Sequence, residues 1–268
     1  MAAQIQAAYP GAWPETVRGL MVHSAEWTAA MKEQFLESQS KSEYAQLLRI
    51  CGYGVPNTVR ATECAANSLT LIAQAELQPF TDDGGTRRMK DMHVHALPWP
   101  REELLALGEV PVTMRVTLSY FIEPGPGEIG WRDRYRYPSH ALRFDVNAPS
   151  ETRDGFIRRL NVAARDEGAP QEAEGGAGRW IIGSQGRSLG SVHSDIWIGT
   201  AADVAACSLV GVYPVVGWWR ERAYLGRCNR SARYTLIVSV VTPAVDVDIY
   251  TPVAIRMGIP INVAGGAI

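Results

Sequence analysis

The 268-residue chain lacks several features that mark common functional classes. It has no apolar run near the roughly 18 residues that cross a bilayer, and its N-terminus lacks the basic and apolar segments of a secretory signal peptide. A formal net charge of −2 gives no general electrostatic attraction to nucleic acid or to an anionic membrane. These absences argue against a membrane protein and a nucleic-acid-binding protein, and they favour the cytoplasm.

Cysteine is sparse and widely spaced, and no two cysteines form a CxxC pair. The four are Cys51, Cys64, Cys207 and Cys228. We expect free thiols in a reducing compartment. The 46% of hydrophobic residues and 20% of charged residues are ordinary for a folded protein, which argues against extensive disorder.

Residues 1 to about 67 have a helical pattern. Pro14 and Glu15 suit the first turn of a helix, and Val17, Leu20 and Met21 follow at helical spacing as its apolar face. Further helices are predicted from the same periodicity and from turn and cap residues, at 29–38, 43–50 and from the cap Asn57 to about residue 66.

From Ser68 the chain changes to short apolar runs separated by Pro, Gly and Asp, which indicates β-structure. Helices are predicted at 100–107 and 152–166, and residues 167–179 have the composition of a surface loop. In Met114–Tyr120 the residues alternate, which predicts one buried and one solvent-facing side. The predicted strands are 68–77, 89–96, 112–122, 141–146, 180–182, 191–197, 209–216, 233–241 and 247–250.

The opening segment resembles the region after the nucleophilic serine in subtilisin-like serine proteases (subtilases, peptidase family S8). Ala2-Ala3-Gln4-Ile5-Gln6-Ala7-Ala8-Tyr9-Pro10 is similar to the end of the helix that the serine motif opens. Trp13-Pro14-Glu15-Thr16-Val17-Arg18-Gly19-Leu20-Met21-Val22-His23-Ser24-Ala25 is similar to the next helix. Gly52-Tyr53-Gly54-Val55-Pro56 resembles the turn before the last helix of the catalytic domain, and Asn67–Gln74 its exit strand.

Later segments resemble the β-rich domain that follows the catalytic domain in one group of bacterial subtilases. They are Leu97–Pro100, Arg115–Phe121, Leu142–Val146, Ser191–Trp197, Tyr213–Trp219 and Val245–Val253. The resemblance implies an α+β chain: helices left from a subtilase α/β catalytic domain over residues 1–80, then a jelly-roll-like β-sandwich with two inserted helices over residues 81–268. It implies no cofactor and covers only the C-terminal part of such a protease.

The catalytic motifs of that family do not occur. A subtilase uses Asp in an Asp-[Ser/Thr]-Gly context, His in His-Gly-Thr and Ser in Gly-Thr-Ser, with an oxyanion donor that contributes several kcal/mol. Gly199-Thr200-Ala201 has alanine where the nucleophile would stand, and we interpret it as the start of a helix. No catalytic or cofactor-binding residue is therefore assigned, and we expect the isolated chain to be inactive.

Three other groups of residues are candidate sites. His193-Ser194-Asp195 holds all three triad residue types, but adjacent residues of a strand face opposite sides, which favours a structural role. His93 and His95 share one strand face and could bind zinc or iron with a third ligand from Asp82, Asp83 or Asp91. Asp246 and Asp248 could contribute to a calcium site. Exposed histidines and a solvated strand face are the plainer alternatives.

Two segments combine aromatic and basic residues, 131–137 and 218–222. The first could stack on bases or sugars, bind carboxylates or form cation–π contacts. The second is expected to pack at a domain edge or to face a partner.

Two main hypotheses follow. In the first, the chain is the C-terminal portion of a serine endopeptidase and meets its polypeptide substrate only through a catalytic part outside this sequence. In the second, it is a stand-alone binding or regulatory subunit that pairs with a separate catalytic chain. The resemblance also permits an ATPase partner. A metalloenzyme based on His93 and His95 ranks behind both. A large exposed patch formed by Ile5, Ala8, Leu20, Met21 and Val22 would favour the first, and an apolar face covered by its own chain would favour the second.

Overall fold

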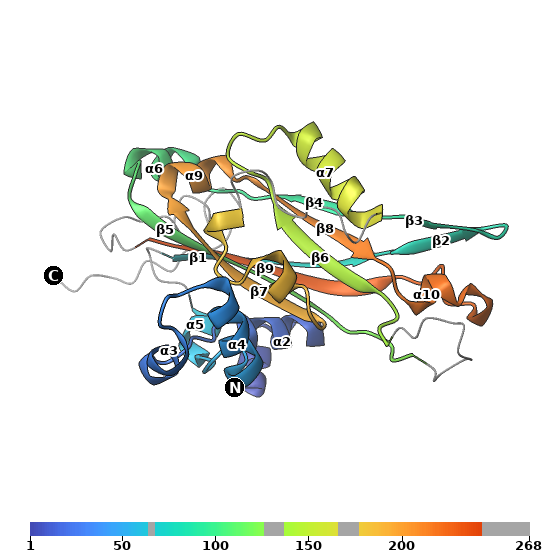
Figure 1. Ribbon diagram of the computed structural model, residues 1–268, viewed down its shortest axis with the longest axis horizontal. Coiled ribbons are helices and arrows are strands. Elements are labelled where there is room, and N and C mark those ends of the chain that lie inside the picture. The colour runs from blue at the N-terminus through green and yellow to red at the C-terminus, as the bar shows by residue number, and fades with distance from the viewer. Residues whose placement is uncertain (64–67, 126–136, 166–176, 243–268) are drawn as a thin grey trace.

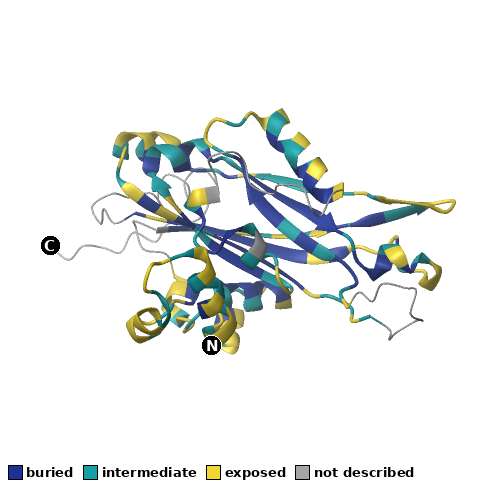
Figure 2. Cartoon of the chain, in the orientation of Figure 1, coloured by how far each residue is buried: buried dark blue, intermediate teal, exposed yellow. Residues whose placement is uncertain are grey.

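The computed structural model describes residues 1–63, 68–125, 137–165 and 177–242 and shows an α+β protein (Figure 1). An N-terminal layer of helices lies against one side of two stacked β-sheets, and a further helix covers the other side. Burial follows these layers, with buried residues concentrated on the strands and exposed residues on the outer helix surfaces (Figure 2). Residues 247–250, predicted as a strand, lie outside the described residues.

The helical layer contains α1 (Ala2–Ala8), α2 (Pro14–His23), α3 (Ala29–Phe35), α4 (Lys41–Cys51) and α5 (Thr58–Thr62). Local signals explain where these helices begin. Pro14 opens α2, Thr28 caps α3, and Ser40 forms a capping box with Glu43 at the start of α4. Asn57 accepts a hydrogen bond from the Arg60 amide, so its predicted capping role is confirmed.

The larger sheet is antiparallel and runs in the order β1 (Ser68–Leu77), β9 (Ala232–Val241), β5 (Pro111–Tyr120) and β7 (Val192–Thr200). Leu118 of β5 pairs with Leu236 of β9 on one side and with His193 of β7 on the other. The last described strand therefore lies between the first one and β5.

The smaller sheet is also antiparallel, in the order β4 (His93–Ala96), β8 (Leu209–Val215) and β6 (Ala141–Val146). The two sheets share one apolar core, which includes Val116 and Leu118 from the larger sheet and Phe144 and Val212 from the smaller one. This is a β-sandwich. A jelly roll has eight strands, and the two sheets hold seven among the described residues.

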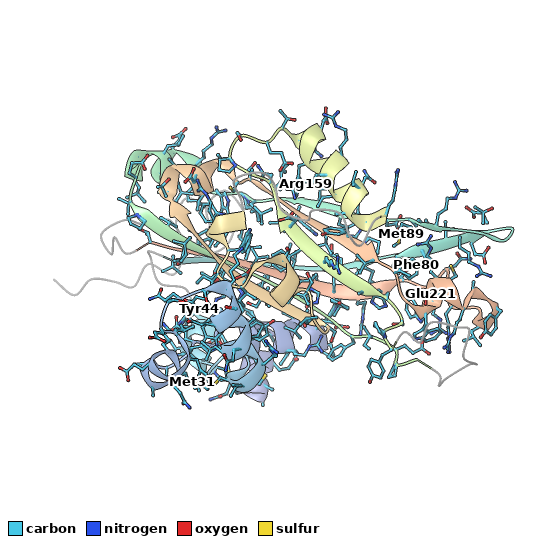
Figure 3. The ribbon with its side chains drawn as sticks, viewed as in Figure 1. Met31, Tyr44, Phe80, Met89, Arg159 and Glu221 are labelled. Atoms are coloured by element: carbon cyan, nitrogen blue, oxygen red, sulfur yellow. The ribbon has the colours of Figure 1, made fainter. Side chains whose placement is uncertain are left out.

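Short elements close the ends of the sandwich. Helices α6 (Arg101–Leu107) and α9 (Ala201–Ala206) pack together at one end. The other end carries the hairpin of β2 (Phe80–Asp83) and β3 (Thr86–Met89) near α10 (Trp218–Glu221), where Figure 3 places Phe80, Met89 and Glu221. The remaining short helices are α8 (Gly183–Arg187) and two 3₁₀ turns, Ala177–Arg179 and Ala223–Leu225.

Helix α7 (Arg153–Arg165) covers the outer face of the smaller sheet. Phe156 and Leu160 are fully buried against Tyr213 of β8. The helix approaches closely at Gly211, where a Cβ atom would lie 2.2 Å from Leu160 Cδ1. A side chain at position 211 would therefore push α7 away from the sheet.

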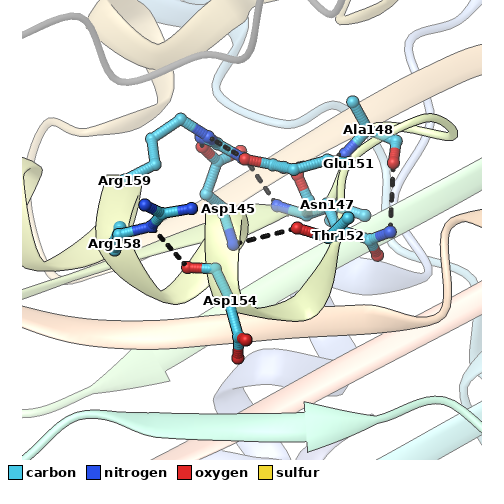
Figure 4. Close-up of polar contacts among 10 residues, drawn as sticks. Asp145, Asn147, Ala148, Glu151, Thr152, Asp154, Arg158 and Arg159 are labelled. Carbon is cyan, nitrogen blue, oxygen red and sulfur yellow. Dashed lines mark hydrogen bonds and ion pairs between the residues drawn. The ribbon is translucent and has the colours of Figure 1, made fainter.

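A polar clamp holds the start of α7 to β6 (Figure 4). The guanidinium of Arg159 forms an ion pair with Asp145, and its Nε lies 2.9 Å from Glu151 Oε1. Arg159 Nη2 also donates to the Val146 carbonyl at 3.2 Å. Removing one member of such a partly buried set would leave the others without compensation, so the clamp fixes the position of α7.

Two strand predictions were wrong in detail. The predicted strand 89–96 is interrupted, because β3 ends at Met89 and β4 begins at His93. Between them, Lys90 and Asp91 donate their amides to the carbonyls of Pro79 and Gln78 instead of continuing a strand. The predicted strand 180–182 is a single bridge from Trp180 to Trp197.

The predicted boundary between residues 80 and 81 falls inside β2, shortly after the end of β1. Strand β1 belongs to the larger sheet of the sandwich and pairs along its whole length with β9, from Ser68 with Val241 to Leu77 with Ala232. The hydrogen-bonded sheet therefore includes residues from both sides of the boundary.

Replacing Leu160 with alanine should destabilise the fold by about 2–5 kcal/mol, because it opens a cavity under α7. Val162 lies on the same helix with 55% of its surface exposed, so Val162→Ala is the matched control and should change stability by less than about 0.5 kcal/mol. Urea unfolding of both variants measures the difference. Equal urea midpoints for the two variants would show that the packing of α7 does not contribute to the cooperative unfolding of the protein.

Candidate functional site

The contact between the helical layer and the larger sheet is polar and buried. Arg115, Thr117 and Ser119 of β5 face the helices, and Thr117 and Ser119 are fully buried. The prediction of a solvent-facing side for this strand was therefore wrong at these positions, because α2 packs against β5 and β9. We call this contact the polar seam; its members are Thr16, Arg18, His23, Arg115, Thr117, Ser119, Ser194, Thr235 and Ser239.

Helix α2 presents a mixed face to the seam. Its buried residues are Glu15, Thr16, Gly19, Leu20 and His23, whereas Val17 and Met21, predicted for the apolar face, are only partly buried. A Cβ atom at Gly19 would lie 2.9 Å from Ile237 Cδ1, so this glycine lets the helix approach the sheet closely. The i, i+3, i+7 spacing of Thr16, Gly19 and His23 marked this face in the sequence.

His23 is the centre of the seam. Its Nδ1 lies 2.8 Å from Thr117 Oγ1, and its Nε2 lies 2.8 Å from Ser239 Oγ. Burial, and then the nearby charge of Arg115, hold the pKa of His23 well below 6.5. A catalytic triad places a carboxylate on Nδ1 of the histidine, and here that position is taken by a threonine hydroxyl. The His23–Ser239 pair is thus a structural hydrogen bond.

Two arginines donate hydrogen bonds to backbone carbonyls across the seam. Arg18 of α2 donates to the carbonyls of Tyr120 and Ser191, and its guanidinium lies 4.0 Å from the ring centroid of Phe121. Arg115 of β5 donates in the opposite direction, to the carbonyl of His23 at 2.7 Å and to that of Ala25. These bonds satisfy backbone groups at the end of α2 and at the end of β5.

The neighbours His193, Ser194 and Asp195 are all buried on β7, with His193 and Asp195 on the sandwich face and Ser194 on the face toward the helices. Ser194 Oγ lies 2.7 Å from Thr117 Oγ1 in the seam. Asp195 lies on the sandwich side and accepts hydrogen bonds from the amides of Ile182 and Gly183. Ser194 and Asp195 thus each join β7 to another segment of the chain.

Tyr53 of the helical layer adds a further contact with β7. Its hydroxyl donates to the Val192 carbonyl and accepts from the Ser194 amide. Burial raises the pKa of Tyr53 to about 12, so the hydroxyl keeps its proton at neutral pH. The helical layer therefore forms hydrogen bonds with the edge strand β7 as well as with the central strands β5 and β9.

The predicted metal residues have different surroundings. His93 and His95 both lie on β4, and each places a ring nitrogen 2.7 Å from the hydroxyl of Tyr234. Burial raises the pKa of Tyr234 well above its ordinary value. Asp246 and Asp248 lie outside the described residues. Within the described ranges no three His, Cys, Asp or Glu side chains converge.

The proposed aspartate ligands are engaged elsewhere. Asp91 accepts the Gln78 amide, and Asp82 and Asp83 face Arg87 and Arg88 across the β2–β3 hairpin. These three carboxylates therefore do not complete a site with His93 and His95.

The second aromatic–basic segment is part of the core. Trp218 and Trp219 are buried, and their indole nitrogens donate to the carbonyl and the carboxylate of Glu123. The first segment lies outside the described residues except for Tyr137, which is exposed. The cysteines that the structure describes, Cys51, Cys207 and Cys228, are free, as predicted.

Comparison of the chain with protein-family models, with curated proteins and with solved structures finds no match. In the part of the chain that the structure describes, no helix combines the length and the hydrophobicity needed to cross a membrane.

Replacing Arg18 with methionine should destabilise the fold by about 2–3 kcal/mol, because charged hydrogen bonds across the seam are lost while the apolar stem is kept. Arg49→Met is the matched control, since Arg49 is exposed on α4 and its Nε donates to the Ala45 carbonyl of the same helix. Urea unfolding checks the difference. Equal stability of the two variants would contradict a structural role for the seam.

Acidification should weaken the fold through its buried histidines. Burial lowers the pKa of His140 to about 4 and that of His23 well below 6.5. In the unfolded chain both titrate near about 6.5, so below that pH the unfolded state binds protons that the folded state does not. Stability present above pH ~6.5 is then lost as the pH falls, by about 2 kcal/mol per histidine at pH ~5.

The variant His23→Gln isolates one contribution, because glutamine can hydrogen-bond but does not titrate. The free energy of unfolding of this variant should change by about 2 kcal/mol less than that of the unmodified protein between pH ~7 and pH ~5. Urea denaturation at both pH values gives the change in the free energy of unfolding for each protein. Equal changes in the two proteins would mean that His23 accepts a proton in the folded protein.

Proposed function

We propose that the chain is the non-catalytic C-terminal part of a subtilisin-like serine endopeptidase, in which the β-sandwich carries helices that belong to the catalytic domain. The observation that carries this proposal is the polar seam. Interfaces between domains are more polar than domain cores, and α2 meets the sheet through arginine, histidine, threonine and serine side chains. On this proposal the larger sheet of the sandwich fixes the position of α2 through these side chains.

The resemblance of the sequence to subtilases supports the same proposal. The segment Trp13–Ala25, similar to the helix after the nucleophile helix, contains α2 and supplies Arg18 and His23 to the seam. The Gly52–Pro56 segment, similar to the turn before the last catalytic-domain helix, supplies Tyr53. The residues that carry the resemblance thus include residues that join the two layers.

The helical layer also presents apolar side chains to solvent. Ile50, Val55 and Val59 are each more than half exposed, at the end of α4, in the following turn and on α5. Exposed apolar residues that gather in one contiguous patch mark surfaces covered by another part of a protein, whereas single ones are ordinary. On this proposal the remainder of the catalytic domain covers them and supplies the aspartate, histidine and serine for peptide-bond hydrolysis.

A second candidate function is a stand-alone binding subunit that pairs with a separate catalytic chain. The observation that favours it is the burial of the N-terminal helices by their own chain. Ile5 and Leu20 are buried in a cluster with Ala61 and Ile237, while Ala8 is exposed. The helical layer therefore buries apolar residues against its own chain, including Ile237 of β9, as a folded subunit requires.

A fluorophosphonate probe tests the absence of catalysis in this chain. We expect no labelled serine and no cleavage of casein, because Ser194 and Ser239 are buried and bonded to side chains of the seam. An active subtilisin serves as the positive control, and Ser194→Ala and Ser239→Ala identify any labelled residue. Stoichiometric labelling abolished by one of these substitutions would contradict the proposal.

The DNA upstream of the coding region distinguishes the two candidates. An in-frame Gly-Thr-Ser segment, with casein cleavage by the extended chain and probe labelling of that serine, would support the endopeptidase. A separate upstream gene encoding a triad, whose product forms a stoichiometric complex with this chain, would support the subunit. A region that encodes no triad in either arrangement would contradict both.

A further inference from the structure

Two imidazoles and a phenol from opposite sheets meet at one point inside the sandwich. His93 and His95 project from β4, and Val94 between them packs toward α7, so both histidines face the larger sheet. Tyr234 projects from β9 in that sheet. Its hydroxyl oxygen lies 2.7 Å from His93 Nδ1 and 2.7 Å from His95 Nε2.

The phenol and the two imidazoles have few protons with which to form hydrogen bonds to one another. A phenol hydroxyl carries one proton and can donate it to only one of the two nitrogens. The other imidazole must therefore direct its own N–H at the oxygen. If both imidazoles carry their proton on the nitrogen remote from Tyr234, two nitrogen lone pairs and the phenol oxygen converge on the same small volume.

We propose that His93, His95 and Tyr234 form a binding site for one divalent transition-metal ion, with copper favoured over zinc, which links β4 to β9. Imidazole nitrogen suits both ions, and Cu²⁺ lies at the top of the general order of affinity. Three protein ligands leave a position for water. The site is separate from the polar seam, since these side chains lie on the opposite side of the larger sheet.

Binding of the metal ion requires two protons to move. The imidazole that donates to Tyr234 moves its proton to its other ring nitrogen, and the phenol proton leaves for solvent as its oxygen coordinates the ion. Each bound ion therefore releases one proton. The ion offsets the effect of burial on Tyr234, because a bound cation favours the phenolate.

The distances require a small opening. Nitrogen ligands lie about 2.0–2.1 Å from the metal, and in the square-planar arrangement that Cu²⁺ prefers this separates neighbouring donor atoms by about 2.9 Å. Each imidazole must therefore withdraw from the phenol oxygen by about 0.2 Å. β4 can supply this movement because it is a four-residue edge strand. His93 and His95 are half-buried, so the ion has access from the side of β4.

A second His–Tyr–His group in the same core provides an internal contrast. Tyr120 lies between His140 and His193, but its hydroxyl is 3.5 Å from His193 Nε2. His140 Nδ1 lies 3.0 Å from Ser139 Oγ instead. The same residue types are present there without two nitrogens directed at one oxygen.

The test is a titration of the metal-free protein, purified without a histidine tag, with Cu²⁺ and separately with Zn²⁺. We expect one Cu²⁺ per chain, a visible phenolate-to-copper charge-transfer band and a raised melting temperature, because an ion bound only by the folded state stabilises it. His95→Gln should lower the affinity by more than about 100-fold, since even outer ligand partners contribute 10–100-fold.

Tyr234→Phe keeps the buried ring and should abolish the charge-transfer band and weaken Cu²⁺ binding. Tyr224→Phe, at a tyrosine that is 67% exposed, is the matched control and should retain both. No saturable binding by the unmodified protein, or an unchanged affinity and band in Tyr234→Phe, would overturn the proposal. Circular dichroism of each variant confirms that a loss of binding is not a loss of fold.

Discussion

The arrangement of the whole chain depends on the hydrogen-bonded contact of α2 with the larger sheet. One face of β5 packs apolar residues into the sandwich core, and the other presents Arg115, Thr117 and Ser119 to the helices. A buried polar group without a partner costs about 1–3 kcal/mol, so each must meet a specific partner. His23 and Arg18 provide such partners, which fixes α2 in one position and orientation in a way that a purely apolar contact would not.

The same requirement accounts for the hydrogen bonds that Ser194 and Asp195 form. Serine, histidine and aspartate occur together in the seam and on β7 because buried hydroxyls, imidazoles and carboxylates need hydrogen-bond partners. Asp195 holds the segment that carries Ile182 and Gly183 beside β7, and Ser194 joins β7 to β5 through Thr117. Their polar character follows from the need to join layers, and none of these contacts has the order of a catalytic relay.

Much of the fold could be predicted from local pattern. Pro14, Ser68 and Asn57 marked element boundaries that the structure places within a residue, and alternation identified β5. The face of α2 was predicted only in part, because periodicity counts apolar residues: Leu20 is buried as expected, but the helix also buries threonine, glycine and histidine. The partner of His93 and His95 could not be predicted, because Tyr234 is about 140 residues away and only sheet packing brings it near. The burial of Thr117 could not be predicted either, because it depends on contact with a helix about 100 residues earlier.

The position of β9 has a consequence for the order of events during synthesis. This strand is the last one described, yet it pairs with β1 on one side and with β5 on the other. Until it has left the ribosome, β1 has no partner in its sheet and the seam lacks Thr235 and Ser239. Pairing of distant segments is slow and leaves strands exposed in the meantime. The N-terminal helices can therefore form early but must wait for almost the entire described chain before they dock.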